Sequence, residues 1–267
     1  MDIWHVIFDD TLTKNIESKI DSILKAKSNR GGLDDGFDGR KVMNEVLDKP
    51  AMLSMYGMIN SHVISYVDGV ISAGKESVVF RAVGGDDSYV ALKVYLVTAS
   101  NFKRRQQYIV GDPRFGRIRG GTRNMIKVWA QKEYRNMLQC TAADIPVPRP
   151  IRVSGSVLAM EFIGSNGVPA KTLQVLPVCA SDYADVLSIV SRMYHDTGLV
   201  HGDLSGYNIF RTDGGLVVFD LGSAIDIRHP GAHDLLKRDI RNITRFFVRK
   251  GLTVPDPDDT YQSIVAA

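Results

Sequence analysis

The sequence has few of the features that mark disulfide-bonded, secreted or membrane proteins. Only 2 cysteines occur in 267 residues, and the separation of Cys140 and Cys179 fits no metal-binding spacing. We therefore expect no disulfide framework, and two reduced, buried thiols of a cytoplasmic protein. No apolar run is long enough to span a bilayer. The N-terminus carries Asp2, Asp9 and Asp10 instead of a basic region followed by an apolar core, which argues against a signal peptide.

A strong net charge of either sign is also absent. The formal net charge is +3, while 24% of the residues are charged and 44% are hydrophobic. This composition indicates a soluble globular protein and gives no general reason for binding polyanions. The length is compatible with one bilobal domain or with two small ones.

The most informative segment runs from His201 to Asn208 and is followed by Asp220-Leu-Gly222. An acid, an amide five residues later and a second acid after an apolar strand form the arrangement used for phosphoryl transfer. Asp203 can accept a proton from an attacking hydroxyl group, while Asn208 and Asp220 offer oxygen ligands to a hard cation. The same pattern could also arise by chance in an acid-rich turn between two apolar runs.

Two upstream features support phosphoryl transfer. Lys93 lies in the middle of an alternating, β-rich segment, where an inward-facing lysine needs an anion or a carboxylate. Strand lysines of this kind hold nucleotide phosphates and pair with a glutamate on the following helix. Glu133 is the only acid in the predicted helix Val128–Leu138. Taken alone, Lys93 could be a surface residue on an edge strand, but the order of the four elements argues against that.

A glycine-rich G-x-G-x-x-G loop is missing before Lys93. The segment from Val70 to Phe80 takes its place and predicts two strands joined by a turn of small residues. Backbone N–H groups and a lysine in this turn could bind phosphates, although the segment could also be an ordinary hairpin. The candidate nucleotide-binding residues are Ser72, Gly74, Lys75, Glu76 and Ser77.

Five separated motifs, in this order, resemble the RIO family of atypical protein kinases. They are Ser72–Phe80, Trp129–Asn136, Met160–Gly164, His201–Phe210 and Arg228–Pro230. The resemblance is strongest to the type-one branch in its short archaeal form and covers roughly residues 50 to 250. It implies an atypical serine/threonine kinase and ATPase that acts in maturation of the small ribosomal subunit. The chain departs from the usual family pattern at Ser77-Val78, Gly202 and Gly206, where Ala-Asn, Ala and Glu are common.

The resemblance also assigns the nucleotide pocket. ATP would lie between two lobes together with Mg²⁺, or with Mn²⁺ in its place. Met160 would line the back of the adenine site, and backbone groups of Glu161 and Ile163 would bind the adenine edge. Phe210 and Phe219 could form walls of a purine slot or could simply pack in the core.

These features predict an α+β, bilobal, protein-kinase-like fold. We expect an N-terminal helical extension over residues 1–65, a β-rich small lobe over 66–163 and a mainly helical large lobe over 164–267. Apolar periodicity and glycine content divide the extension further. It should contain a helix over 11–27, a linker over 31–39, and one or two helices over 41–64 that are interrupted at Pro50.

Residues 96–127 are rich in basic side chains and contain a single acid, Asp112. This segment could be a solvated loop, or it could contact RNA phosphates or the nucleotide. Thr98, Ser100 and Thr122 are candidate autophosphorylation sites in or near it.

Near the C-terminus, basic residues recur every four positions on the face opposite an apolar stripe. The basic face could be merely solvated or could touch rRNA, and Arg238, Asp239 and Arg241 could instead brace the catalytic loop. The basic positions are Lys237, Arg241, Arg245 and Arg249, and the apolar positions are Leu236, Ile240, Ile243, Phe246 and Phe247.

No A-P-E motif follows Asp220, and Arg228-His-Pro230 comes soon after it. We therefore expect no conventional activation segment and no peptide-binding subdomains. We expect the partners to be ATP and the small ribosomal subunit precursor with its rRNA. The protein should be a monomer or weak dimer without a membrane association, and its protein substrate is unknown. Three alternatives stay open: a small-molecule phosphotransferase, a tRNA-modification-associated kinase, and a nucleotide-gated assembly factor with incidental catalysis.

Overall fold

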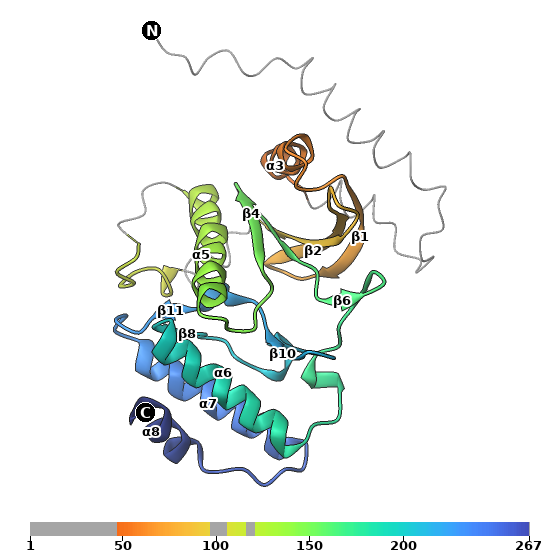
Figure 1. The fold of residues 1–267 in the computed structure, drawn as a ribbon. Coiled ribbons are helices and arrows are strands. Elements are labelled where there is room, and N and C mark those ends of the chain that lie inside the picture. The colour runs from red at the N-terminus through yellow and green to blue at the C-terminus, as the bar shows by residue number, and fades with distance from the viewer. Residues whose placement is uncertain (1–46, 97–105, 116–120, 267) are drawn as a thin grey trace.

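A five-stranded antiparallel sheet forms one lobe of the molecule (Figure 1). The computed structural model describes residues 47–96, 106–115 and 121–266, so the helix and linker predicted before residue 47 lie outside the described residues. The strand order is β1-β2-β3-β5-β4. The bounds are β1 Tyr66–Ala73, β2 Ser77–Val83, β3 Tyr89–Tyr95, β5 Val157–Glu161 and β4 Pro150–Ser154.

Strand β3 is the centre of this sheet and carries Lys93. It pairs with β2 on one side and with β5 on the other, so that Lys93 lies opposite Val79 and Leu158. Every residue of β3 after Tyr89 is buried. Lys93 is therefore not a surface residue on an edge strand, and the sheet holds its backbone on both sides.

Helix α3, Lys49–Asn60, packs on one face of the sheet through Ala51, Met55 and Met58. Its N-cap is Asp48, whose side chain accepts a hydrogen bond from the backbone N–H of Ala51. Pro50 lies in the first helical turn, where a missing N–H leaves no helical hydrogen bond unmade. Helix α3 thus begins next to Pro50, and the predicted helical residues before this point, 41–46, lie outside the described residues.

Helix α5, Thr122–Ala142, contains the predicted glutamate helix and is the main link between the lobes. It packs against β4 and β5 of the sheet and against the short 3₁₀ helix η5, Leu221–Ser223, of the other lobe. Trp129, Glu133 and Asn136 recur at helical spacing and are buried, so this face of the helix is covered.

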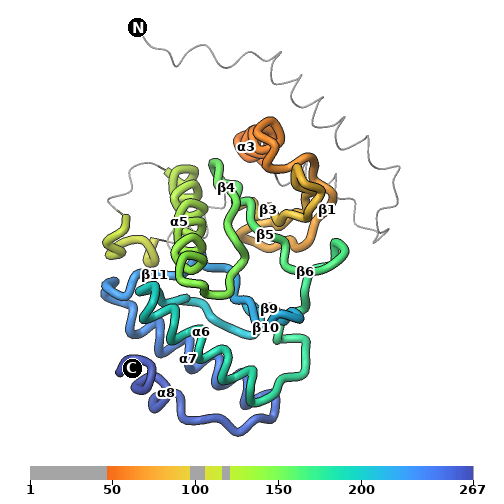
Figure 2. Tube along the Cα trace, in the orientation of Figure 1, coloured from red at the N-terminus to blue at the C-terminus, as the bar shows by residue number. Residues whose placement is uncertain are grey.

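The second lobe is mainly helical (Figures 1 and 2). Helices α6 and α7 run alongside each other in both views, and α8 packs on both. The ring of Tyr183 meets that of Phe247 edge-on, with centroids 5.2 Å apart. The elements are β6 Gly164–Ser165, β7 Val168–Pro169, η3 Leu173–Val175, α6 Ala180–Asp196, β8 Leu199–Val200, η4 Gly206–Asn208, β9 Ile209–Thr212, β10 Gly215–Val218, β11 Ile225–Asp226, α7 Ala232–Arg249 and α8 Pro257–Ala266.

This arrangement is the bilobal α+β fold that the sequence predicts. Only the segment from Leu221 to Gly231 separates Asp220 from α7, so the chain has no room there for a conventional activation segment. Among the helices built from the described residues, none combines the length and the apolarity needed to cross a membrane. One prediction about the thiols is wrong, because Cys140 is buried but Cys179 is exposed at the start of α6.

Helix α7 shows the two faces that the sequence predicts. The apolar positions Leu236, Ile240, Ile243, Phe246 and Phe247 are all buried. Helix α8 covers part of the basic face, because Arg241 forms an ion pair of 2.9 Å with Asp258 and Lys237 lies over the ring of Tyr261. Arg241 therefore does not brace the catalytic loop.

The core position Phe247 gives a direct test of the packing between α6 and α7. Phe247→Ala should lower the free energy of unfolding by about 3–5 kcal/mol, because it leaves a cavity at a fully buried ring. The neighbouring Val248→Ala is the control, since Val248 is 53% exposed and should change stability by less than about 0.5 kcal/mol. Urea unfolding measures both values, and equal effects would contradict the burial of Phe247.

Candidate active site

The centre of the candidate site is an ion cluster that joins three elements from both lobes. The Nζ atom of Lys93 lies 3.0 Å from each carboxylate oxygen of Glu133 on α5. It also lies 2.6 Å from Oδ1 of Asp220, which follows β10. Lys93 and Glu133 are almost completely buried, whereas the Asp220 side chain is half exposed. The lysine predicted from the β-strand pattern therefore meets both predicted acids.

The charges in this cluster depend on one another. Burial alone would lower the pKa of Lys93, but Asp220 and Glu133 outweigh that effect and raise the pKa of the amine. Burial raises the pKa of Glu133, and Lys93 opposes part of that increase. One ammonium group thus faces two acids, and the cluster is suited to an additional cation beside the exposed Asp220.

Asp220 occupies an unusual backbone conformation, with φ 63° and ψ 58° in the left-handed region. A non-glycine residue rarely adopts this conformation, which costs of order 1–3 kcal/mol and persists only where the surroundings enforce it. The adjacent Phe219 N–H donates to the carbonyl oxygen of Asn208 at 2.9 Å. This bond holds the two predicted metal ligands at adjacent points of the backbone.

The catalytic loop follows β8 and is stabilised by internal hydrogen bonds. Nδ1 of His201 accepts a hydrogen bond from the backbone N–H of Asp203, which leaves Nε2 to donate to the carbonyl oxygen of Phe219 at 3.1 Å. Nδ2 of Asn208 donates to the carbonyl oxygen of Asp203 at 2.9 Å, so the Oδ1 atom is the one suited to a metal. His201 is buried and braces the loop, while Asp203 is exposed.

Helix α7 supports the same loop from below. The buried Asp239 accepts hydrogen bonds from the N–H groups of Gly202 and Leu204, at 2.7 and 3.0 Å. Arg238 donates to the carbonyl oxygen of Gly202. Two of the three residues that the sequence suggested as braces therefore contact the loop.

Two glycines explain departures from the usual family pattern. Gly202 has φ +76°, where a side chain is strained, and a Cβ atom would lie 2.7 Å from the carbonyl oxygen of Ser223. A Cβ atom at Gly206 would lie 2.7 Å from the ring of Phe246. The close approach of α7 to the loop therefore leaves no room for a glutamate at position 206 without a shift of that ring.

A cavity of about 310 Å³ lies between the turn after β1 and the two acids of the large lobe. The turn itself is closed by a hydrogen bond of 2.9 Å from the N–H of Gly74 to the carbonyl oxygen of Ser77. Ser72 lies outside the cavity, exposed near the end of β1. The lining residues are Gly74, Lys75, Glu76, Ser77, Tyr108, Trp129, Asp203, Asp220 and Ser223.

Three of these lining residues are absent from the sequence-based set. Trp129 lies one helical turn before Glu133, so the helix period could have placed it beside the site. Ser223 comes three residues after Asp220 in the same loop. Tyr108 belongs to the segment 106–115, whose position no local pattern predicts, and its ring meets that of Trp129 edge-on at 6.0 Å.

The predicted adenine-side residues lie apart from this cavity. Met160 and Glu161 end β5, and Ile163 lies between the lobes. The N–H of Glu161 donates to the carbonyl oxygen of Arg149, and the carbonyl oxygen of Ile163 accepts from Ala170. The carbonyl oxygen of Glu161 and the N–H of Ile163 are then the groups that suit an adenine edge, and this part of the site stays a prediction.

Phe210 and Phe219 stack on each other. Their centroids are 3.9 Å apart and their planes differ by 14°. Because the two rings touch face to face, a purine cannot lie between them. The stacked pair can therefore contact a purine only with an outer ring face, as one wall of the predicted purine slot.

The oxygen donors of the site suit a metal ion that brings other ligands with it. Among the described residues, no group of three or more His, Cys, Asp or Glu side chains could hold a metal ion. Mg²⁺ is usually bound by one or two protein oxygens together with phosphates and waters. Asn208 and Asp220, beside a phosphate-sized cavity, fit a Mg²⁺ ion that arrives with a nucleotide.

Comparison with known proteins decides the family. The RIO domain model matches residues 78–260. The chain is 40% identical over 228 residues to the RIO-type serine/threonine-protein kinase Rio1 of Haloferax volcanii, which covers 85% of this chain and 78% of that protein. The chain belongs to the RIO family. It is also 37% identical to Rio1 of Methanocaldococcus jannaschii over 79% of this chain and 72% of the relative. These archaeal relatives agree with a type-one RIO kinase.

Other RIO proteins are longer or more distant. The human serine/threonine-protein kinase RIO1 is 35% identical over 80% of this chain, which spans only 39% of that protein. A crystal structure of the Rio2 kinase from Chaetomium thermophilum, an ADP/Mg²⁺-phosphoaspartate complex, has a TM-score of 0.63 at 18% identity. That alignment covers 96% of this chain and 89% of the Rio2 chain. At this identity the likeness shows the fold alone, and it confirms the bilobal arrangement.

The ion cluster yields a prediction about stability and activity together. Lys93→Met should lower the free energy of unfolding by about 3 kcal/mol, because two acids lose their buried counter-charge. Adding Glu133→Gln should restore part of that stability by removing one of the acids. Neither variant should transfer phosphate, since both lack the lysine. Urea unfolding and an ATP-turnover assay measure the two effects.

The matched control is Lys49→Met, at an exposed lysine of α3, which should change neither quantity. A Lys93→Met protein as stable as this control would show that the cluster contributes nothing to the fold.

Proposed function

We propose that this RIO protein is an atypical serine/threonine protein kinase and ATPase that binds Mg-ATP between its two lobes. The observation that carries the proposal is the cavity lined by Asp203, Asp220 and the Gly74–Ser77 turn, with Lys93 ion-paired to Asp220 at its edge. Membership of a family whose relatives are named serine/threonine-protein kinases supports the enzyme class.

Each residue has a distinct role in the proposed reaction. Lys93, held by Glu133, contacts the nucleotide phosphates, and the backbone N–H groups of the Gly74–Ser77 turn lie beside them. Asn208 and Asp220 would hold the metal through their side-chain oxygens, and Mg²⁺ bound there would supply neutralisation of the phosphate charge.

Asp203 performs the proton transfer. Its carboxylate accepts the proton from a serine hydroxyl group or from a water molecule as the oxygen attacks the γ-phosphorus atom. The bond between that phosphorus and the bridging oxygen breaks, ADP leaves, and the γ-phosphoryl group ends on the hydroxyl or on water. The exposure of Asp203 and its bonded backbone fit this role, because an acceptor must be both reachable and fixed.

The proposed activity is slow and is linked to a large partner. The short segment after Asp220 supplies no peptide-binding platform, so hydrolysis that regulates attachment to a partner is a better use of the site than rapid turnover of peptides. The Chaetomium Rio2 complex contains a phosphoaspartate. Asp220, beside the phosphate cavity, is the candidate for the same chemistry in this chain.

The family resemblance directs the choice of partner. We propose the precursor of the small ribosomal subunit, with its rRNA, and a cytoplasmic location. The exposed Arg245 and Arg249 on α7 are suited to rRNA phosphates, because α8 leaves this end of the basic face uncovered.

Removal of the proton acceptor tests the catalytic assignment. Asp203→Ala should reduce ATP turnover and autophosphorylation by about 10²–10⁴-fold while changing the affinity for Mg-ADP less than about threefold. The control is Asp213→Ala, at an exposed acid in the turn between β9 and β10, which should behave as the unaltered protein. Turnover by Asp203→Ala at the control rate would remove Asp203 from the mechanism.

The partner is tested by repeating the assay with purified small ribosomal subunits. A change in Asp203-dependent turnover on adding subunits supports the ribosomal role. Turnover that depends on Asp203 but is indifferent to subunits would keep the kinase and reject this partner.

A further inference from the structure

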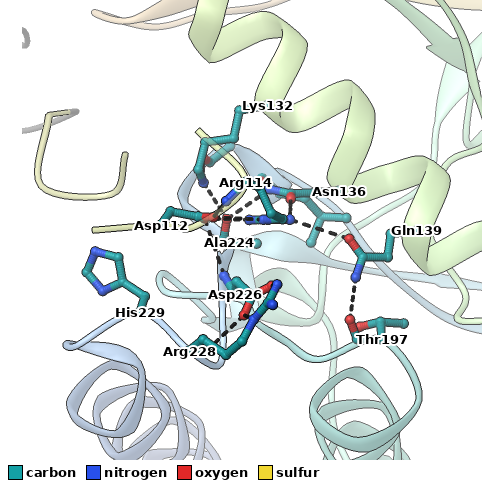
Figure 3. A network of polar contacts seen from close by, with 12 residues as sticks. Asp112, Arg114, Lys132, Asn136, Gln139, Thr197, Ala224, Asp226, Arg228 and His229 are labelled. Atoms are coloured by element: carbon teal, nitrogen blue, oxygen red, sulfur yellow. Dashed lines mark hydrogen bonds and ion pairs between the residues drawn. The ribbon is translucent and has the colours of Figure 1, made fainter. Parts of the chain in front are cut away.

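Four residues of helix α5 form a continuous contact with the backbone of the loop that carries the proposed metal ligand. The residues are Trp129, Lys132, Glu133 and Asn136, here called the α5 clamp, and the metal loop is Asp220–Ala224. Their spacing of three, four and seven residues after Trp129 puts them on one face of the helix. Figure 3 shows Lys132 and Asn136 on this face of α5, close to Ala224.

Lys132 makes the most unusual contact. Its side chain is completely buried, and its Nζ atom donates to the carbonyl oxygen of Gly222 at 2.8 Å and to that of Ala224. A methionine would fill a similar volume without the cost of burying an amine, but it would leave those two carbonyl groups without these donors. The buried Lys132 therefore holds the backbone of this loop through two hydrogen bonds.

Asn136 holds the same loop from the next turn of the helix. Its Nδ2 atom donates to the carbonyl oxygens of Leu221 and Ala224, at 2.8 and 2.9 Å. The orientation of the amide is defined, because Arg114 donates to its Oδ1 atom at 2.7 Å and arginine has no acceptor. Arg114 is itself held by the buried Asp112 at 2.7 Å (Figure 3).

The other two clamp residues close the contact. Glu133 pairs with Lys93, and the backbone N–H of Leu221 acts on its carboxylate by lowering its pKa against the raising effect of burial. Trp129 packs so closely on Gly222 that a Cβ atom there would lie 2.8 Å from the indole nitrogen. Every residue from Leu221 to Ala224 except Ser223 is thus held by a side chain of α5.

In regulated protein kinases, the lysine–glutamate pair and the metal-binding acid must both be in place, and control acts by moving the helix. Here the helix and the metal loop share a buried set of hydrogen bonds, so the glutamate and Asp220 cannot move independently. We propose that Lys132 is a positioning residue that, with Asn136, locks Asp220 into its metal-binding conformation from helix α5. This inference rests on the proposed role of Asp220 as a metal ligand.

The first test needs no metal and no nucleotide. Lys132→Met and Asn136→Leu should each accelerate amide hydrogen exchange in a peptide covering residues 219–226 by about tenfold, because the loop loses two hydrogen bonds. The matched controls are Gln131→Met and Gln131→Leu, at an exposed position of the same helix, and they should leave this exchange unchanged.

The second test measures ADP affinity with and without Mg²⁺. In the clamp variants the Mg²⁺-dependent gain in affinity should fall by about tenfold, while affinity without Mg²⁺ stays as in the controls. A folded clamp variant with exchange and Mg²⁺ dependence equal to its control would overturn the proposal. Equal loss of affinity with and without Mg²⁺ would also overturn it, since that result indicates general damage to the pocket.

Two further comparisons keep the outcomes distinct. If Lys132→Met does not fold, as judged by its thermal unfolding, Asn136→Leu decides by the same two measurements. If the unaltered protein shows no Mg²⁺-dependent ADP affinity, the proposed function fails, whereas the exchange measurement still decides whether the clamp holds the loop.

Discussion

The ion cluster of Lys93, Glu133 and Asp220 is the interaction on which the rest of this structure depends. It joins the central strand of the sheet, the helix between the lobes and the loop after β10. Because the lysine and the glutamate are buried, neither is tolerable without the other, and the fold must bring them together. The geometry required for binding a nucleotide is therefore also a condition for burying the interface between the lobes.

Helix α5 turns this local pairing into a rigid arrangement. Glu133 of this helix contacts the sheet by pairing with Lys93 of β3. Lys132 and Asn136 of the same helix contact the large lobe. In kinases with a long activation segment, activity is controlled by moving the glutamate helix relative to the metal-binding acid. A helix bonded to the metal loop, as here, would not permit that movement. Here the segment from Leu221 to Gly231 is short, so it offers no long activation segment through which this coupling could be changed.

The catalytic loop shows how closely chemistry and packing constrain each other. The strained backbone of Asp220 and the left-handed Gly202 lie at either side of the same loop structure. The carboxylate of Asp239 holds the loop from within α7, and the ring of Phe246 fills the space above Gly206. The departure from the family pattern at Gly206 therefore follows from the close approach of α7, and the one at Gly202 from its left-handed backbone beside Ser223.

The sequence by itself determined the order of the acid, amide and lysine residues, because that order depends on local spacing, and the resemblance of five separated motifs indicated the family and the bilobal fold. It also predicted the pairing of Lys93 with Glu133, since a buried strand lysine needs a partner. Only the tertiary structure decided that Phe210 and Phe219 stack on each other, that Cys179 is exposed and that Tyr108 lines the cavity. Contacts of this kind, like the bonds from Lys132 to two backbone carbonyl groups, join segments far apart in the chain, and the packing of whole elements sets them.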